Sequence, residues 1–212
     1  MATSVQAGPT NPGFESGLFG WTSNNPGQVS AVTSATASTA GSFLTGATAF
    51  TTVLPTEGSM FAAISAGSPT TTLTSSSFMV DIGDLVTFDL AFSAEDYSPY
   101  TDFGAFIVNL FVDGSVIGGG TFATVGSVGN YGFFDWTEFS VLSPVAGLIT
   151  MVFSSTNFGD DLLDSTVFVD NIELIKAVPE PGSVLLLVVG LFAFSFFRKK
   201  NLFKQADNTA VA

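Results

Sequence analysis

The chain has 212 residues, a formal net charge of −13, and neither cysteine nor histidine. These absences exclude a disulfide framework, thiolate and histidine zinc sites, and a Ser-His-Asp triad. No Lys or Arg precedes Lys176, so most of the chain cannot form the cationic patch that binds nucleic-acid phosphates. Nucleic acid is therefore not an expected partner.

Residues 1–8 form the first segment. They lack the basic and apolar regions of a signal peptide, but Val5-Gln6-Ala7 has the small-x-small form of a signal peptidase site. We interpret residues 1–8 as the remnant of a signal-peptide cleavage region, with the signal peptide encoded upstream of Met1. The alternative is a chance match in an Ala-rich segment.

Residues 9–176 show repeated alternation of apolar and polar side chains, which predicts β-strands. In the run 85–92, Val86, Phe88 and Leu90 alternate with Thr87, Asp89 and Ala91, and a second alternating run spans 106–112. Asp113-Gly114 then provides the signal of a type I′ hairpin before a return strand. Further strands are expected at 133–142, 148–153 and 167–175.

So many short strands, in a sequence rich in Gly, Ser, Thr and Phe, predict an all-β fold. The expected architecture is a two-sheet antiparallel jelly-roll-like sandwich over residues 9–176, an ectodomain followed by a single C-terminal transmembrane helix. The Ser-, Thr- and Ala-rich stretch 30–52 is predicted to be either an outer strand pair or a long loop.

The last predicted strand contains an unpaired charge. Strict alternation places Asp170 on one face with Phe168, Ile172 and Leu174. If that face is the core, Asp170 is a buried carboxylate with no Lys or Arg before Lys176 to meet it. Such a group needs hydrogen bonds, protonation or a bound cation with oxygen ligands.

Motifs at both ends of this region resemble those of jelly-roll domains from extracellular bacterial proteins. Residues 11–17, followed by Gly20-Trp21-Thr22, are similar to the opening pattern, and residues 168–174 are similar to the closing strand. In jelly-roll carbohydrate-binding modules a structural calcium often joins the opening Glu to the closing Asp. The resemblance implies Glu15 and Asp170 as Ca²⁺ ligands; the alternative is that Asp170 accepts hydrogen bonds from backbone amides.

Two further groups of acidic residues lie between predicted strands. The first is Glu95, Asp96 and Asp102, interleaved with Tyr97 and Tyr100; the second is Asp160, Asp161 and Asp164. Neither has the fixed spacing of an EF-hand. We predict solvated acidic loops for both, with calcium-binding loops as the alternative.

Aromatic side chains offer candidates for carbohydrate binding, because flat sugar faces stack on exposed rings. The candidates are Trp21, Trp136, Tyr97 and Tyr100, with Tyr131 as an additional ring. Core or edge packing is the alternative, as it is for most of the 23 Phe residues. The partner in the carbohydrate interpretation would be an extracellular polysaccharide.

The C-terminal tail has three parts. Residues 177–182 form a Pro/Gly linker, residues 183–197 are uncharged and apolar, and residues 198–212 begin with Arg198-Lys199-Lys200. The apolar run predicts a membrane-spanning helix of roughly 22 Å, short for a hydrocarbon core of about 30 Å. The basic cluster predicts a cytoplasmic C-terminus. A buried C-terminal helix of the sandwich is the alternative.

This tail resembles the sorting tail of PEP-CTERM proteins. The box is Val178-Pro179-Glu180-Pro181, and the basic end is Arg198-Lys199-Lys200. Residues 88–103 are similar to a segment common in the ectodomains of that family. The resemblance implies recognition by a membrane-embedded exosortase and cleavage near the box. The additional residues 201–212 depart from the family pattern, in which most tails stop soon after the basic cluster.

Together these features predict a non-enzymatic exported protein of the cell surface or extracellular matrix. It would cross the inner membrane once, with its ectodomain outside the cytoplasm, and reach the surface after processing. The alternatives are a surface-displayed carbohydrate-binding module, which needs exposed aromatic rings, and a glycoside-active enzyme, which needs two carboxylates facing across a groove.

Overall fold

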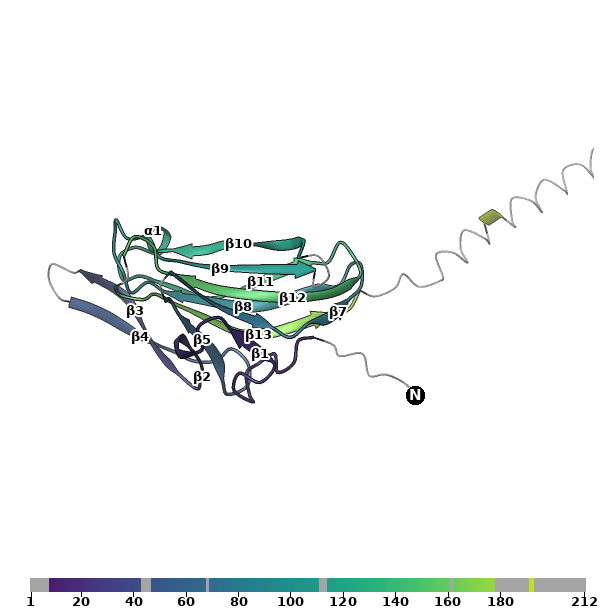
Figure 1. Cartoon of the computed structure of the whole chain (residues 1–212), viewed down its shortest axis with the longest axis horizontal. Helices are drawn as coiled ribbons and strands as arrows, with labels where there is room; N and C mark the ends of the chain where they lie inside the picture. Colours follow the sequence, from purple (N-terminus) through teal and green to yellow (C-terminus); the bar gives the residue numbers. More distant parts are fainter. Residues whose placement is uncertain are drawn as a thin grey trace, which may run out of the picture. The chain divides into compact units, whose positions relative to one another are not determined.

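The computed structural model describes residues 8–42, 47–67, 69–110, 114–160, 162–177 and 191–192 (Figure 1). The chain divides into two units, Met1–Ala177 and Val178–Ala212. The described strands and short helices of the first unit are β1 (Trp21–Ser23), η1 (Pro26–Gln28), β2 (Val29–Val32), β3 (Ala35–Ser42), β4 (Ala47–Val53), β5 (Phe61–Ser65), β6 (Thr70–Ser75), β7 (Phe78–Val80), β8 (Leu85–Ser93), β9 (Phe103–Leu110), β10 (Val116–Thr124), α1 (Val125–Val128), β11 (Phe133–Leu142), β12 (Gly147–Thr156) and β13 (Thr166–Ile175).

The strands form two main antiparallel sheets. One has the order β10-β9-β12-β7 and the other the order β11-β8-β13-β5-β2; β1 pairs with β6, and β3 with β4. Figure 1 shows the two sheets as stacked layers, with the β3–β4 hairpin as a separate ribbon beside them. The predicted two-sheet antiparallel sandwich is confirmed, as is the antiparallel pairing of β9 with its return strand β10.

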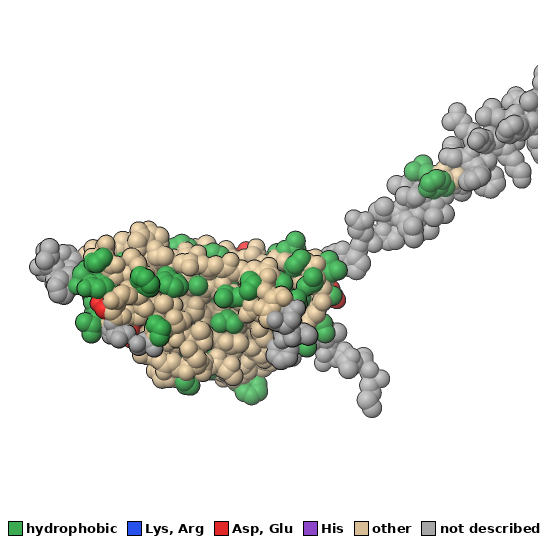
Figure 2. Space-filling model, turned by 45° about the horizontal axis from the view of Figure 1, so that its top comes forward, with side chains coloured by type: hydrophobic (Ala, Val, Ile, Leu, Met, Phe, Trp, Pro, Cys, Tyr) green, Lys and Arg blue, Asp and Glu red, His purple; other side chains and the backbone are tan. Residues whose placement is uncertain are grey.

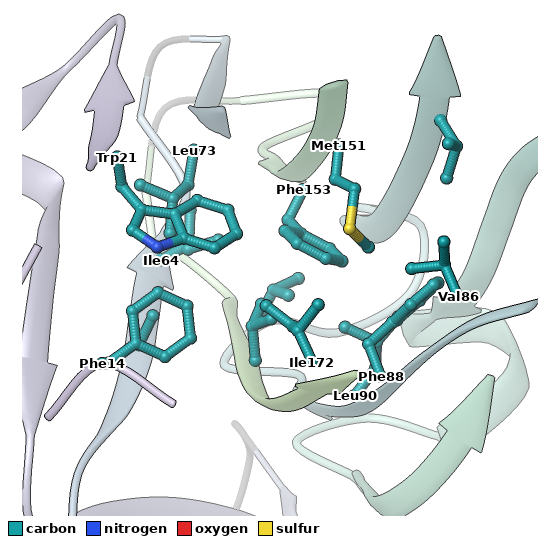
Figure 3. Close-up of a cluster of buried hydrophobic side chains, with 14 of the residues drawn as sticks. Phe14, Trp21, Ile64, Leu73, Val86, Phe88, Leu90, Met151, Phe153 and Ile172 are labelled. Atoms are coloured by element: carbon teal, nitrogen blue, oxygen red, sulfur yellow. The ribbon is translucent and has the colours of Figure 1, made fainter. Parts of the chain in front are cut away.

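The main core lies between the two sheets. Phe88 and Leu90 of β8 meet Met151 and Phe153 of β12, and all four side chains are fully buried (Figure 3). Phe88 and Phe153 pack edge to face, with ring centroids 5.4 Å apart. Burying several rings of this size contributes the dominant favourable term in folding a chain with so few charged residues.

The opening motif closes one part of this core. Phe14 and Trp21 pack with ring centroids 5.0 Å apart, and Trp21 also contacts Phe153 at 6.1 Å (Figure 3). The indole Nε1 donates a hydrogen bond to the Asn11 carbonyl, and the Asn11 side chain in turn bonds Ser16 and Gly17. The motif therefore fixes the N-terminal segment against the sandwich by packing and hydrogen bonding together.

A second, smaller core covers the outer face of the five-stranded sheet. The β3–β4 hairpin supplies Ala37 and Val53, which pack against Phe61, Ala91 and Phe168 of the sheet. The stretch 30–52 thus contains an outer strand pair, as one of the two predictions had it. Because the hairpin covers β8 from outside while β12 packs from inside, β8 is buried on both faces from its second residue onward.

The closing strand β13 corrects the predicted alternation. Its pairing with β8 shifts register between Asp170 and Glu173, and Asn171 adopts a left-handed φ of 50°. This bulge adds one residue, so Phe168 packs in the outer core whereas Ile172 faces the main core (Figure 3). The prediction that these side chains share one face is wrong, and Asp170 lies on the hairpin side of the sheet.

Most of the predicted tail lies outside the described residues. This applies to the Val178–Pro181 box and to the basic cluster Arg198–Lys200. At the other end of the chain, all of the predicted cleavage remnant 1–8 except Gly8 also lies outside the described residues. Of the apolar run 183–197, Leu191 and Phe192 are described, and both are helical. Within the part of the chain that the structure describes, no helix is long and apolar enough to cross a membrane.

Candidate functional site

Glu15 uses both carboxylate oxygens to hold the loop between β4 and β5. Its Oε1 accepts hydrogen bonds from the amides of Ser59 and Met60 at 2.6 and 2.9 Å, and its Oε2 accepts one from the Ser59 hydroxyl at 2.6 Å. These hydrogen bonds, that of the Ser59 hydroxyl first, lower the pKa of Glu15. The carboxylate therefore stays ionised on an exposed edge of the sandwich.

Asp170 on β13 also binds the loop between β4 and β5. Its Oδ2 accepts hydrogen bonds from the amide and hydroxyl of Thr56, at 2.7 and 3.2 Å, and from the amide of Glu57 at 3.1 Å. Its Oδ1 is buried without a hydrogen-bond partner. Burial raises the pKa of Asp170 although these hydrogen bonds act against the rise.

The two predicted calcium ligands are thus brought to one loop, 54–60. Asp170 fits the role of a cation ligand, because its buried Oδ1 has no donor to meet it. Glu15 fits less well, because both of its oxygens already accept hydrogen bonds. No three acidic side chains within the described ranges converge as a metal-binding group. The backbone-amide alternative therefore accounts for Oδ2 of Asp170 and leaves Oδ1 open.

The aromatic candidates for sugar stacking differ in exposure. Trp21 is only 7% exposed and belongs to the main core, so it cannot present a face to a sugar. Tyr97 and Tyr100 are half-buried and pack edge to face in the loop between β8 and β9. Tyr131 stacks on Tyr97 and is buried. Trp136 is half-buried on β11 and remains the best-placed indole.

A bulge in β11 gives Trp136 its orientation. The register with β8 shifts between Phe134 and Thr137, so the chain gains a residue at this point. Trp136 consequently packs on the outer core, 5.7 Å from the ring of Phe61, while its Nε1 donates to the Leu54 carbonyl at 2.9 Å. Without this bulge, the alternation of β11 would turn the indole toward the main core.

A groove of about 350 Å³ lies between the β3–β4 hairpin and β11. Its lining combines aromatic and aliphatic side chains with hydroxyls and one carboxylate: Thr39, Thr51, Thr52, Val53, Leu54, Phe133, Asp135 and Trp136. Phe50 and Leu54, both well exposed, lie on the same hairpin. An apolar floor with a few polar groups is the usual lining of a small-molecule site.

The first acidic group is not the solvated loop that the sequence predicts, whereas the described members of the second group keep part of their surface exposed. Asp96 and Asp102 are both fully buried, and Asp160 and Asp164 are half-buried. Asp102 accepts hydrogen bonds from the Phe158 amide at 2.9 Å and from the Ser165 hydroxyl at 2.8 Å. Asp161 lies outside the described residues. Burial of these carboxylates arises because three loops close over one end of the sandwich.

The first cation in the sequence closes the opposite end. Lys176 forms ion pairs with Asp84 at 2.9 Å and with Asp81 at 3.4 Å, and the amide of Ala177 donates to Asp84 at 2.8 Å. Burial opposes the ionisation of Asp84, but the hydrogen bond from the Asp81 amide, followed by the contacts with Lys176 and Ala177, outweighs it and lowers its pKa.

Asp170→Ala and Asp170→Asn provide a test of this loop attachment. Alanine leaves the amides of Thr56 and Glu57 without an acceptor, so the free energy of unfolding should fall by about 2–4 kcal/mol. Asparagine keeps an acceptor and removes a buried charge, so it should change this free energy by less than about 1 kcal/mol. Urea unfolding in EDTA measures both, with exposed Glu138→Ala as the control; equal losses for the two Asp170 variants would contradict this geometry.

Comparison with known protein families identifies a motif in the C-terminal tail. Residues 177–200 match the PEP-CTERM protein-sorting motif. No curated protein matches the sequence.

Among solved structures, TmCBM61 in complex with β-1,4-galactotriose is similar at 12% identity over 81% of this chain and 99% of that one, with a TM-score of 0.48. A family 16 carbohydrate-binding module reaches 16% identity over 79% and 98%, with a TM-score of 0.41. The K3 cleaved adhesin domain of Lys-gingipain from Porphyromonas gingivalis reaches 12% over 81% and 99%, with a TM-score of 0.47. The chain is a β-sandwich protein that carries a PEP-CTERM protein-sorting motif.

Proposed function

We propose that this chain is a non-enzymatic exported protein, sorted by an exosortase and displayed at the cell surface or in the extracellular matrix. The sorting motif at residues 177–200 carries the proposal. Residues 183–197 cross the inner membrane once, and the basic cluster that follows them keeps the C-terminus in the cytoplasm. Cleavage near Val178–Pro181 then releases the sandwich from the apolar segment.

The described surface is compatible with an extracellular location. It has few charges, and Figure 2 shows a face made mostly of uncharged side chains. The only cation of the described residues, Lys176, is engaged in ion pairs with Asp81 and Asp84. A domain without free cations resists association with other acidic surface polymers and with nucleic acid.

Processing is tested by peptide mapping of the mature protein from its native host. We expect a chain that ends near Val178–Pro181 and lacks peptides from 183–197. Glu180→Ala alters the box and should leave the apolar peptides attached in the membrane fraction. Gln205→Ala, outside the matched motif, is the control and should be processed normally. Wild-type protein found intact through Ala212 would mean a permanent anchor and would refute exosortase processing.

A structural calcium ion at the loop 54–60 is a second part of the proposal. Asp170 Oδ1 is its first ligand, and Glu15 binds the same loop from the outside. Calcium supplies positive charge where the chain has none, which would stabilise the loop in a calcium-rich exterior. Millimolar Ca²⁺ should raise the melting temperature of the wild type relative to EDTA. The rise should be smaller in Asp170→Asn; an equal rise in both would place the ion elsewhere.

Carbohydrate binding is the second candidate function, and the groove at Trp136 favours it. The half-buried indole offers a stacking surface, and the Thr hydroxyls and Asp135 offer hydrogen-bond partners for sugar hydroxyls. Because the only charge in the lining is negative, neutral polysaccharides would bind better than polyuronates. The ligand class of this candidate is therefore a neutral extracellular polysaccharide.

Trp136→Ala should weaken binding of a neutral galactan or glucan about tenfold in affinity electrophoresis. Because Trp136 also packs on Phe61, the variant can lose stability, so Thr51→Val serves as a second variant that removes only a hydroxyl. Phe158→Ala, an exposed ring outside the groove, is the matched control. If Trp136→Ala and Phe158→Ala bind equally, or if the wild type binds none of these polysaccharides, the carbohydrate candidate fails.

A further inference from the structure

Asp96 is, with Asp170, one of two buried carboxylates among the described residues that have an oxygen without a hydrogen-bond partner. It lies in the loop after β8 and is 0% exposed. Among the described residues it accepts one hydrogen bond, from the amide of its neighbour Tyr97 at 2.7 Å to Oδ1. Its Oδ2 is buried and has no partner. By contrast, Asp102 has donors at both oxygens. A buried carboxylate oxygen without a donor costs several kcal/mol unless something neutralises it.

Three loops converge on Asp96. The amide of Tyr131 donates to the Asp96 carbonyl at 2.9 Å, and the amide of Val125 donates to the Asp102 carbonyl at 3.0 Å. The amide of Phe158 reaches the Asp102 carboxylate. The loops 94–102, 125–132 and 157–160 are therefore held together at one end of the sandwich, with Asp96 enclosed among them.

The surroundings of Asp96 are negative. Burial is the largest effect that opposes the ionisation of Asp96, and the negative charges of Asp102 and Asp160 add to it. Together these effects raise the pKa of Asp96 to about 6. Lys176, the only cation among the described residues, bonds Asp81 and Asp84 at the other end of the sandwich. Nothing described in this chain can therefore balance the charge of Asp96.

A second unpartnered oxygen lies in the same group of loops. Asn157 directly precedes Phe158 and is 4% exposed, and its side-chain Oδ1 has no hydrogen-bond partner. Its Nδ2 donates to Asp164 at 3.1 Å, which fixes which atom of the amide is the oxygen. Two buried oxygens without donors, one from a carboxylate and one from an amide, are ligands of the type that Ca²⁺ prefers.

We propose that the loops 94–102, 125–132 and 157–160 bind a calcium ion, with Asp96 Oδ2 as its anionic ligand. This site is distinct from the one at Asp170 and goes beyond the sorting function. All available ligands are oxygens, and the chain has no His or Cys, which selects a hard cation over zinc or copper. Because no three acidic side chains of the described residues converge, neutral oxygens and water complete the shell.

Tb³⁺ luminescence on the full-length chain in detergent tests the site. Tyr97 follows Asp96 directly and stacks on Tyr131 at 6.0 Å, so a Tb³⁺ ion bound here should be excited through these tyrosines. Ca²⁺ should displace the Tb³⁺ signal. Asp96→Asn keeps the size of the side chain and should weaken Ca²⁺ affinity at this site by at least about tenfold. Asp81→Asn, an exposed carboxylate at the other end, is the charge-matched control and should leave the site unchanged.

Asp170→Asn separates the two calcium proposals. A saturable, tyrosine-excited site must remain in this variant, whatever happens at the loop 54–60. Loss of the signal in Asp170→Asn but not in Asp96→Asn would overturn the proposal for Asp96 and leave the one for Asp170 standing. If neither variant changes a wild-type signal, the ion is bound elsewhere and the proposal for Asp96 fails; the one for Asp170 is then decided by the melting temperatures in Ca²⁺ and EDTA.

Protonation of Asp96 is the competing way to neutralise it. In that case Asp96 binds a proton in the folded state at pH values where it is still ionised in the unfolded chain, from its pKa of about 6 down to its unfolded pKa. The free energy of unfolding therefore rises as the pH falls through this window. Asp96→Asn would then be more stable than the wild type at pH 7 with or without Ca²⁺. Such a result would overturn calcium binding, whereas a stability difference that Ca²⁺ closes supports it. Urea unfolding of both proteins supplies this measurement even if luminescence is weak.

Discussion

A sandwich with no Lys or Arg before its last strand must satisfy its carboxylates with hydrogen bonds. Four acidic residues do so by holding a segment distant in sequence: Glu15 holds residues 59–60, Asp170 holds 56–57, Asp102 holds 158 and 165, and Asp84 holds 177. Each uses backbone amides, whose donors are fixed by the fold. Because cations are scarce, these four acidic side chains bind backbone amides of distant loops, and the positions of those loops depend on them.

This constraint explains why two carboxylate oxygens stand out. Asp170 has one satisfied and one orphaned oxygen, and Asp96 has only the hydrogen bond from its neighbour. In a chain with Lys or Arg nearby, such oxygens would be met by an ammonium or guanidinium group. Here only a proton, water or an external cation can meet them. Under the two calcium proposals an external ion meets these oxygens, and the free energy of unfolding would then be lower where calcium is scarce.

The sequence predicts the strands from β8 to β13, where apolar and polar side chains alternate, but it does not locate β1, β2, β5, β6 or β7. The alternation predicts the wrong face of the sheet for side chains that follow a β-bulge. Nothing in the local sequence marks the register shifts at Asn171 in β13 and at Trp136 in β11, yet each reverses the faces of the following residues. The burial of Asp96 and Asp102 could not be predicted from the sequence either, because it depends on contacts among three loops far apart in the chain.

The strand registers separate two ends of the ectodomain. At one end β13 finishes beside Leu85, and Lys176 with Ala177 is clamped onto Asp84 as the chain leaves the sandwich. At the other end, beside Ser93, lie the loops around Asp96 and the exposed apolar side chains Phe158, Leu162 and Leu163. An ion bound among the loops of the opposite end would stiffen the part of the domain farthest from the exit, where a displayed protein meets its surroundings.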